Sequence, residues 1–247
     1  MTSRLETALV TGATSGIGAA TVRSLAASGR TVLAIGRRED RLEALADETG
    51  CRWMAADVRD TEILAPEIDG FAPDIVVNNA GVGHGITGLD DVDPDTIHEA
   101  VDINVLAPIQ ITALALAGMR RRGRGHIVNV GSIAGLHTLG SALYGATKSA
   151  VHRFSQNLRS ELRGTGIRVS EICPGRVTSE FYGVASGDDA TLAAMGDSGI
   201  RELTPGDIAD AILFVVDAPD HVNVAMIELL PTEQAIGGVD HTPVGNG

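Results

Sequence analysis

The chain of 247 residues is poor in cysteine, in positive charge and in long apolar runs. Its two cysteines, Cys51 and Cys173, fall in separate predicted strands and lack the spacing of metal ligands. We therefore expect two reduced thiols in a cytoplasmic protein. The seven histidines are scattered, so the sequence indicates no metal site.

The scarcity of positive charge argues against two classes of partner. The formal net charge is -13 and the pI is about 4.8, so nucleic-acid phosphates and anionic membrane surfaces would repel the chain. Residues 1–6 contain no apolar segment of a signal peptide. The least charged stretch, 103–119, is too short and too polar to span a bilayer. We expect neither a nucleic-acid partner nor a membrane partner.

The chain does contain enough apolar sequence, 44%, to form one large α/β domain. Short apolar runs, typical of buried strands, alternate with patterns typical of helices. We place this domain at 1–235, and we expect the glycine-rich tail at 236–247 to be flexible. The segment 180–203 loses clear periodicity and is rich in Gly, Ser and Asp, which is typical of a lid.

A glycine-rich turn joins the first predicted strand, 7–11, to the first predicted helix, 19–27. It reads Gly12-Ala13-Thr14-Ser15-Gly16-Ile17-Gly18. Glycines in such a turn let the backbone and the helix N-terminus approach a pyrophosphate closely. Glycine is also common in ordinary strand-to-helix turns, but the strand and helix on either side favour a dinucleotide site.

The second predicted strand, 31–35, is followed by Gly36-Arg37-Arg38. Folds that bind NAD usually place an acidic residue near this point, where it holds the ribose 2′-hydroxyl. Here two cations precede a helix, 41–49, whose dipole they oppose, so helix stability does not explain them. A bound 2′-phosphate would explain the two arginines, which favours NADP(H). The alternative is a pair of solvated surface arginines.

Two further strand ends carry polar residues. Asp57-Val58 follows the third predicted strand, 52–56, and could contact an adenine, although Asp57 could equally be a polar strand terminus. The fourth strand, 74–77, ends in Asn78-Asn79-Ala80-Gly81. This motif offers side-chain amides and an open backbone to a ligand.

A hydroxyl, a phenol and an ammonium can converge at the end of the apolar run 127–130. Ser132 follows this predicted strand at its carboxyl end, where open α/β sheets bind ligands. Tyr144 and Lys148 are four residues apart near the start of a predicted helix, which places both on one face. Tyr-x-x-x-Lys also occurs by chance in many helices, so its weight depends on the upstream motifs.

Several remaining segments complete the predicted domain. The helix 94–117 is apolar on nearly every side beyond Asn104, so we expect it to bury one face against the sheet and another against a second subunit. A strand at 167–172 leads into Cys173-Pro174-Gly175-Arg176-Val177. A helix at 206–216 and a strand at 222–229 follow.

Taken in order, these motifs resemble the short-chain dehydrogenase/reductase superfamily in its single-domain branch. They cover residues 5–234: the glycine turn from Thr11 to Gly18, Asn78-Asn79-Ala80-Gly81, Asn104, Ser132, Tyr144-Gly145-Ala146-Thr147-Lys148 and Pro174-Gly175. Gly36-Arg37-Arg38 fits its NADP-preferring members. The gap from Ser132 to Tyr144 is one residue shorter than in many members. The resemblance implies a Rossmann-like, doubly wound α/β domain: a seven-stranded parallel sheet, order 3-2-1-4-5-6-7, with helices on both faces.

The resemblance also implies roles for four residues. Tyr144 would protonate a ketone oxygen as hydride arrives, and Lys148 would lower its pKa and hold the nicotinamide ribose. Ser132 would bind the substrate oxygen, and Asn104 would position a water for proton relay. A tyrosine working near neutral pH needs its pKa lowered by ~3 units, or ~4 kcal/mol. One ammonium at ~4 Å supplies ~4 kcal/mol at an effective dielectric constant of ~20, so Lys148 is sufficient.

The cofactor-binding residues that we expect follow from the same motifs. They are Gly12, Thr14, Ser15, Gly16, Ile17, Gly18, Arg37, Arg38, Asp57, Val58, Asn79, Ala80, Gly81, Tyr144, Lys148, Pro174, Gly175 and Val177.

The sequence says least about the substrate, for which we expect a small secondary alcohol or its ketone. The segment 180–203 holds five acidic residues and one arginine, so its charge of 1 - 5 = -4 should exclude acyl-carrier and coenzyme A substrates. The run 222–234 is similar to that of NADP-dependent serine and 3-hydroxy acid dehydrogenases of the family, which points to a 3-hydroxy acid. Arg176 could hold the carboxylate of such an acid, or its side chain could simply be solvated. Ser132, His137, Tyr144 and Arg176 are the candidate substrate residues.

Several alternatives remain open at this point. A ketone reductase of a biosynthetic pathway could share the tail sequence. Relatives that serve as NADP(H)-binding sensors lose the Tyr/Lys pair, which is intact here. Extended relatives that act as epimerases or dehydratases have a larger C-terminal domain. The resemblance further implies a homotetramer or a dimer.

Overall fold

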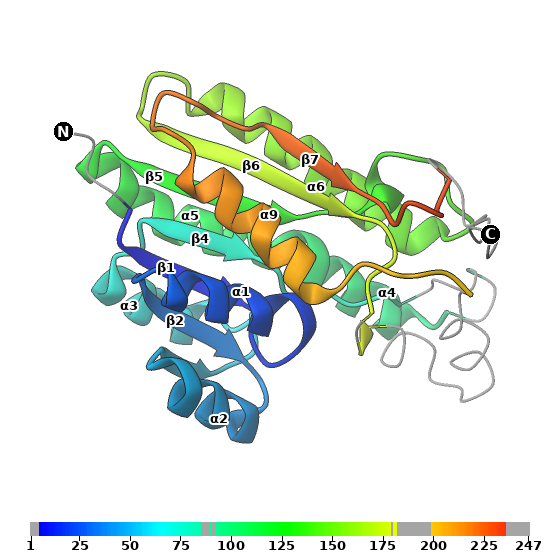
Figure 1. Cartoon of the computed structure of the whole chain (residues 1–247), viewed down its shortest axis with the longest axis horizontal. Coiled ribbons are helices and arrows are strands. Elements are labelled where there is room, and N and C mark those ends of the chain that lie inside the picture. The colour runs from blue at the N-terminus through cyan, green and yellow to red at the C-terminus, as the bar shows by residue number, and fades with distance from the viewer. Residues whose placement is uncertain (1–4, 85–88, 90–91, 179, 182–198, 236–247) are drawn as a thin grey trace, which may run out of the picture.

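Within the described residues, seven parallel strands form one sheet in the order β3-β2-β1-β4-β5-β6-β7 (Figure 1). The computed structural model describes residues 5–84, 89, 92–178, 180–181 and 199–235. The strands are β1 (Thr7–Thr11), β2 (Thr31–Gly36), β3 (Arg52–Ala55), β4 (Ile75–Asn78), β5 (Gly125–Val130), β6 (Ile167–Pro174) and β7 (Met226–Leu229). This strand order confirms the predicted Rossmann-like fold.

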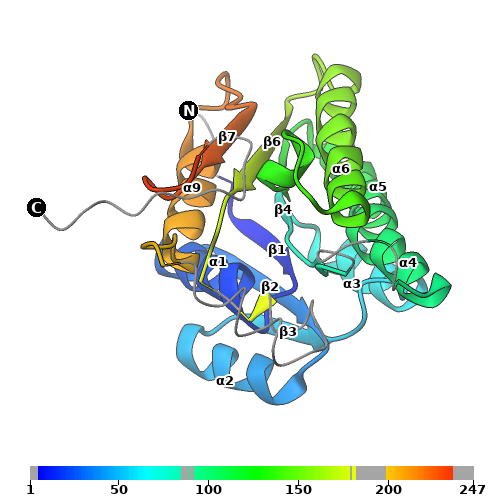
Figure 2. The same ribbon diagram turned by 90° about the vertical axis from the view of Figure 1, so that its right-hand side faces the viewer.

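The helices form a layer on each face of the sheet (Figure 2). One layer contains α1 (Gly16–Ala27), α2 (Glu39–Thr49) and α9 (Pro205–Asp217). The other contains α3 (Thr61–Phe71), α4 (Pro94–Val101), η1 (Asp102–Leu106), α5 (Ala107–Arg122) and α6 (Ala142–Glu161). A short 3₁₀ turn, η2 (Ile133–Gly135), follows β5.

Alternation along the strands explains why both layers are needed. Neighbouring residues of β1 point to opposite faces, so Val10 packs in the core beneath α1 and α9 while Leu9 packs in the core beneath α3 and α5. Strands β5 and β6 are buried over their whole lengths. Parallel strands reach this state only when helices cover both faces. The apolar runs of the sequence supply that double core.

The structure differs from the predicted elements in several places. Helix α1 begins at Gly16, three residues earlier than expected, and α3 was not predicted. Strand β7 begins at Met226 instead of residue 222, and Cys51 lies just before β3. Both cysteines are free and buried. The predicted tail at 236–247 and most of the predicted lid at 180–203 lie outside the described residues.

The predicted helix 94–117 is a continuous helical segment, 94–122, with a π-helical turn, η1, in the middle. By length and mean hydropathy alone this segment could cross a bilayer. From the sequence we expected its central part, 103–119, to be too short and too polar to do so. Its inner face carries Ile103, Ile111 and Met119 into the core beneath the sheet. The core helix of a soluble protein has the same length and hydropathy.

The topology fixes where a ligand can bind. The strand order reverses between β1 and β4, which are neighbours in the sheet although two strands separate them in the chain. The connections from these strands leave on opposite faces, which opens a crevice at their carboxyl ends. The glycine turn and the Asn79 loop begin at this edge.

Candidate active site

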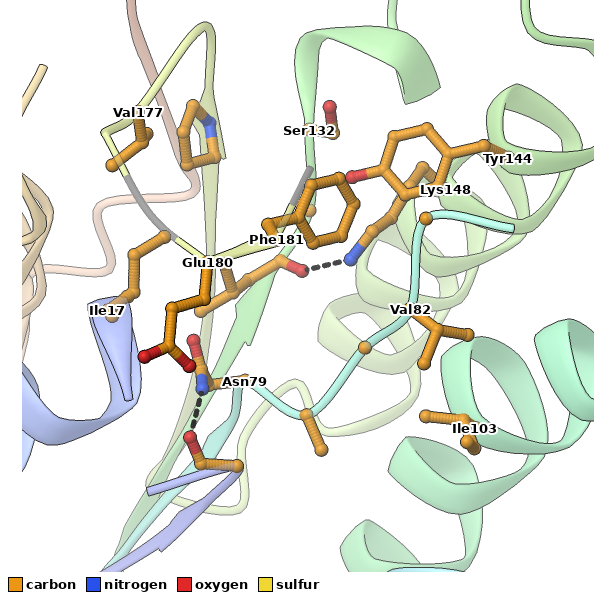
Figure 3. Close-up of a pocket in the computed structure, with 18 of the residues that line it drawn as sticks. Ile17, Asn79, Val82, Ile103, Ser132, Tyr144, Lys148, Val177, Glu180 and Phe181 are labelled. Carbon is orange, nitrogen blue, oxygen red and sulfur yellow. Dashed lines mark hydrogen bonds between the residues drawn. The ribbon is translucent and has the colours of Figure 1, made fainter. Parts of the chain in front are cut away.

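A cleft of about 500 Å³ lies at the carboxyl edge of the sheet (Figure 3). Its lining includes most of the residues predicted from sequence: Gly12, Thr14, Ser15, Gly16, Ile17, Arg37, Arg38, Asp57, Val58, Asn79, Ala80, Gly81, Ser132, Tyr144, Lys148, Pro174, Gly175, Arg176 and Val177. Three predicted residues, Gly18, Asn104 and His137, lie behind this lining. Gly36, Val82, Glu180, Phe181 and Gln234 line the cleft but were not predicted.

The glycine turn packs tightly against the loop after β4. Gly12 has a φ of +66°, and a Cβ there would lie 2.8 Å from the Cα of Ala80. A Cβ on Gly18 would lie 2.2 Å from the carbonyl oxygen of Gly12. The Asn79 side chain donates to the carbonyls of Thr11 and Gly12 at 2.9 and 3.2 Å. Side chains are therefore excluded at both glycines, and Gly18 acts from inside α1 as a packing position.

Helix α1 presents an open N-terminus to the cleft. Its N-cap, Ser15, is extended and makes no side-chain capping bond, and the first turn holds no acidic residue. The first N–H groups of a helix have no partner within it, and the helix dipole places partial positive charge there. These features suit the anion that the glycine turn predicts.

Beside this N-terminus, Arg38 is held by two hydroxyls. Its Nε and Nη2 donate to Thr14 Oγ1 at 3.1 and 2.9 Å, and Nη2 donates to Ser15 Oγ at 2.8 Å. A Cβ at Gly36 would lie 2.5 Å from Thr14 Cγ2. The Thr14 methyl group therefore fills the place where an NAD-binding fold carries an acidic side chain.

The other predicted groups at this end are Arg37 and Asp57. Arg37 is exposed at the rim of the cleft. Asp57 accepts from Arg59 Nε and Nη2 at 2.9 and 2.8 Å. These hydrogen bonds, with a smaller contribution from the charge of Arg37, hold the pKa of the Asp57 carboxyl below its usual value. Contact of Asp57 with an adenine stays a prediction.

At the opposite end of the cleft, Ser132, Tyr144 and Lys148 converge (Figure 3). Tyr144 and Lys148 occupy one face of α6, and Lys148 Nζ lies 5.8 Å from the centroid of the Tyr144 ring. Nζ is buried and donates to the Val130 carbonyl at the end of β5, at 2.9 Å. Ser132 Oγ accepts from the N–H of Ala134 at 3.1 Å, which fixes its position at the start of η2. The structure thus brings the three groups together, as the sequence predicted.

The buried Lys148 has an unusual pKa. Burial lowers the pKa of its ammonium to about 8, and the neighbouring Glu171 partly opposes this effect. Burial in turn raises the pKa of the Cys173 thiol far above its usual value, so Cys173 is no nucleophile at neutral pH. Lys148 therefore titrates near physiological pH.

Asn104 lies in the π-helical turn η1 and holds the loop after β4 from behind. Its Oδ1 accepts from the N–H of Val82, and its Nδ2 donates to the Val82 carbonyl, both at 2.8 Å. Nδ2 also donates to Thr147 Oγ1 at 3.1 Å. Extra residues in π-helical turns are frequent at functional sites. The side chain positions the loop opposite Lys148, and its predicted role with a water stays a prediction.

The candidate substrate residues Arg176 and His137 are both paired with carboxylates. Arg176 Nε donates to Glu202 Oε1 at 2.7 Å, and both side chains are largely buried. His137 Nε2 lies 2.6 Å from Glu228 Oε1, outside the lining of the cleft. Sequence reasoning missed both carboxylates, since Glu202 is 26 residues and Glu228 is 91 residues from its partner.

The segment after β6 adds two residues to the cleft that the sequence did not indicate (Figure 3). The Phe181 ring lies 5.5 Å from the Tyr144 ring, centroid to centroid, and covers the phenol end of the cleft. Glu180 accepts from Arg38 and Arg41 at the other end. The only available signal was the acidic character of 180–203, which does not say which carboxylate points inward.

Comparisons with known proteins agree with this geometry. Residues 6–188 match a family model described as short chain dehydrogenase. A probable NADP-dependent dehydrogenase of Haemophilus influenzae is 38% identical over 96% of this chain and 97% of its own. The NADP-dependent 3-hydroxy acid dehydrogenase YdfG of Salmonella typhi is 38% identical over 94% of this chain and 97% of its own. The closed form of a serine dehydrogenase complexed with NADP⁺ is 35% identical and superimposes with a TM-score of 0.89. The match covers 96% of this chain and 100% of the serine dehydrogenase chain.

The depressed pKa of Lys148 can be measured directly, because Lys148 is the single lysine of the chain. Protein labelled with ¹³Cε-lysine should give one lysine resonance, which should titrate with a midpoint of about 8 because burial disfavours the charged form. The variant Lys148→Arg should lack the resonance. A midpoint above 10, the usual value for a solvated lysine, would contradict the buried position of Nζ.

Proposed function

Because the chain belongs to the short-chain dehydrogenase family, we propose that it interconverts a small secondary alcohol and its ketone by hydride transfer with NADP(H). The observation that carries this proposal is the distribution of groups along one cleft. An anion site of glycines, a helix N-terminus and Arg38 lies at one end, and Ser132, Tyr144 and Lys148 lie at the other. Such a cleft suits a phosphate-bearing cofactor whose reactive ring lies beside a proton donor.

NADP(H) is the cofactor of this protein. The relatives from Haemophilus influenzae and Salmonella typhi are named NADP-dependent, and the serine dehydrogenase was solved with NADP⁺ bound. The residues present fit that cofactor, because Gly36 offers no carboxylate to a ribose 2′-hydroxyl and Arg37 and Arg38 offer positive charge in its place. When bound, the cofactor supplies or accepts the hydride.

Each chemical group of the chain then has a distinct task. The Tyr144 phenol donates a proton to the carbonyl oxygen in reduction and accepts one in oxidation. The Lys148 ammonium stabilises the tyrosinate by its charge, and the Val130 carbonyl fixes Nζ in place. Ser132 Oγ, whose lone pair accepts from Ala134, retains its hydrogen for the substrate oxygen. Phe181 and the loop held by Asn104 limit access of water to these groups.

For the substrate, the geometry favours a neutral ketone or alcohol. Glu202 already neutralises Arg176, the cation of the cleft closest in sequence to Pro174-Gly175. A substrate carboxylate would have to compete with a largely buried ion pair, whose disruption leaves an uncompensated charge. The second candidate, a 3-hydroxy acid, is supported by the name of the Salmonella typhi relative and by the presence of Arg176 in the lining.

The first prediction concerns the cofactor phosphate. Arg37→Ala should raise the KM for NADPH at least ~tenfold, because a charge-assisted bond to phosphate is worth ~1.5–3 kcal/mol, and should hardly change the KM for NADH. Arg120→Ala, which removes an exposed arginine of α5, should change neither. Equal effects of Arg37→Ala on the two cofactors would contradict its role at the phosphate.

The second prediction concerns substrate charge. With NADP⁺ as oxidant, methyl esters of 3-hydroxy acids should turn over faster than the free acids, because Glu202 occupies Arg176. Glu202→Gln should raise kcat/KM for the acids and leave that for the esters unchanged. NADPH absorbance reports both.

The opposite result would select the acid as substrate. If the wild type prefers the acids and Arg176→Ala removes only that activity, Arg176 holds the substrate carboxylate and the neutral-ketone proposal is wrong. If the esters, the acids and a wider panel of ketones all fail to react, the oxidoreductase proposal itself is wrong.

We also propose that the protein is a cytoplasmic homotetramer or dimer in which α4 to α6 pair with their copies in a neighbour. The supporting observation is apolar side-chain exposure on the helical segment 94–122, where Val101 and Leu106 are both at least one-third exposed. Leu106→Glu should therefore weaken assembly in light scattering, and Ile63→Glu, an exposed position of α3, should not. A wild-type monomer at micromolar concentration would contradict the assembly.

A further inference from the structure

The Glu180 carboxylate lies on the arginines at the anion end of the cleft. Arg41 Nη1 donates to both of its oxygens at 2.8 Å, and Arg38 Nη1 donates to Oε2 at 2.9 Å. These arginines are 142 and 139 residues away in the chain, near the start of α2, whereas Glu180 follows β6. The carboxylate therefore joins the segment after β6 to the start of α2 at the lining of the cleft, where Figure 3 shows Glu180.

This carboxylate uses donors that a phosphate would need. An arginine has five N–H donors. Arg38 makes three hydrogen bonds to Thr14 and Ser15 and a fourth to Glu180, which leaves one donor. Hydrogen bonds from Arg41 and Arg38 hold the pKa of the Glu180 carboxyl below its usual value, so it is an anion at neutral pH.

We propose that Glu180 is a specificity-determining residue for the cofactor, because its carboxylate competes with the 2′-phosphate of NADP(H) for Arg38 and Arg41. The inference rests on the NADP(H) assignment above. A cofactor without the 2′-phosphate leaves the contacts of Glu180 in place. Glu180 thus lowers the affinity for NADP(H) and leaves the affinity for NAD(H) unchanged.

The energetics allow this exchange. The side chains of Arg38 and Glu180 are 39% and 51% exposed, and ion pairs at such exposure contribute little. A phosphate carries more negative charge than a carboxylate and has more acceptor oxygens, so it can displace Glu180. Phe181, the neighbour of Glu180 in the chain, lies against the Tyr144 ring while Glu180 contacts the arginines.

Binding of two nucleotides that differ in the 2′-phosphate tests the proposal. Calorimetry should show that Glu180→Gln binds adenosine 2′,5′-bisphosphate ~2–5-fold more tightly than wild type and binds AMP with unchanged affinity. The gain should shrink in high salt. Glu48→Gln is the matched control: Glu48 is also 51% exposed and accepts two 2.8 Å bonds from one arginine, Arg23, outside the cleft.

Two kinds of outcome would overturn the proposal. Weaker or unchanged binding of the bisphosphate by Glu180→Gln would show that the carboxylate does not compete with the phosphate. Equal gains for AMP, or for Glu48→Gln, would assign the effect to net charge alone. Equal binding of the two nucleotides by the wild type would count against the NADP(H) assignment. A gain confined to the bisphosphate in Glu180→Gln would even then support competition between the Glu180 carboxylate and the phosphate.

Discussion

The site depends on one buried cation, the ammonium of Lys148. Burying a charge is costly unless hydrogen bonds and nearby charges compensate. The Val130 carbonyl at the end of β5 accepts from Nζ, and Glu171 of β6 partly opposes the effect of burial on the pKa of Lys148. With a pKa of about 8, Lys148 is protonated in about nine molecules of ten at pH 7. The sheet therefore holds a charge at the place where Tyr144 needs one.

Several features of the fold serve to place this charge. The end of β5 supplies both the Val130 acceptor and, two residues later, Ser132. The helical spacing of four residues carries Tyr144 and Lys148 together. On the far side, the π-helical turn presents Asn104 to the loop that faces Nζ, and a Cβ on Gly81 would lie only 3.6 Å from that atom. Substitutions behind the cleft at Asn104 or Thr147 should therefore act through the position of this loop.

The acidic balance of the chain has a local counterpart in the cleft. Arg38 contacts Glu180 of the segment after β6, and Arg176 contacts Glu202 from the part of the chain just before α9. An exposed pair such as that at Arg38 contributes little, whereas a buried pair such as that at Arg176 is costly to disrupt. Our two proposals, a phosphate at Arg38 and no substrate carboxylate at Arg176, follow from this difference in burial.

Local patterns sufficed to predict the strands, the glycine turn and the candidates Ser132, Tyr144 and Lys148, because each depends on residues close together in the chain. The strand order is a long-range property, and it was predicted from the family resemblance. The partners of Arg38 and Arg176 could not be predicted, since a sequence does not show which of many acidic residues the fold brings to them. Helix α3 was missed, and its Pro66 and Gly70 weaken the helical pattern. The π-helical turn η1 was also missed, because no characteristic amino-acid composition marks such a turn in a sequence. Asn104 was identified from the family motif, but its bonds to Val82 and Thr147 were not.

The proton-transfer role of Tyr144 is the central claim, and Tyr144→Phe tests it most directly when turnover and NADPH binding are measured on the same sample. The account predicts a loss of kcat of ~100-fold or more, as for other removed general acids, with an NADPH dissociation constant within about twofold of wild type. Phenylalanine keeps the ring beside Phe181 and Lys148 and removes only the phenol oxygen. A variant that retains more than a few per cent of wild-type turnover would show that another group donates the proton.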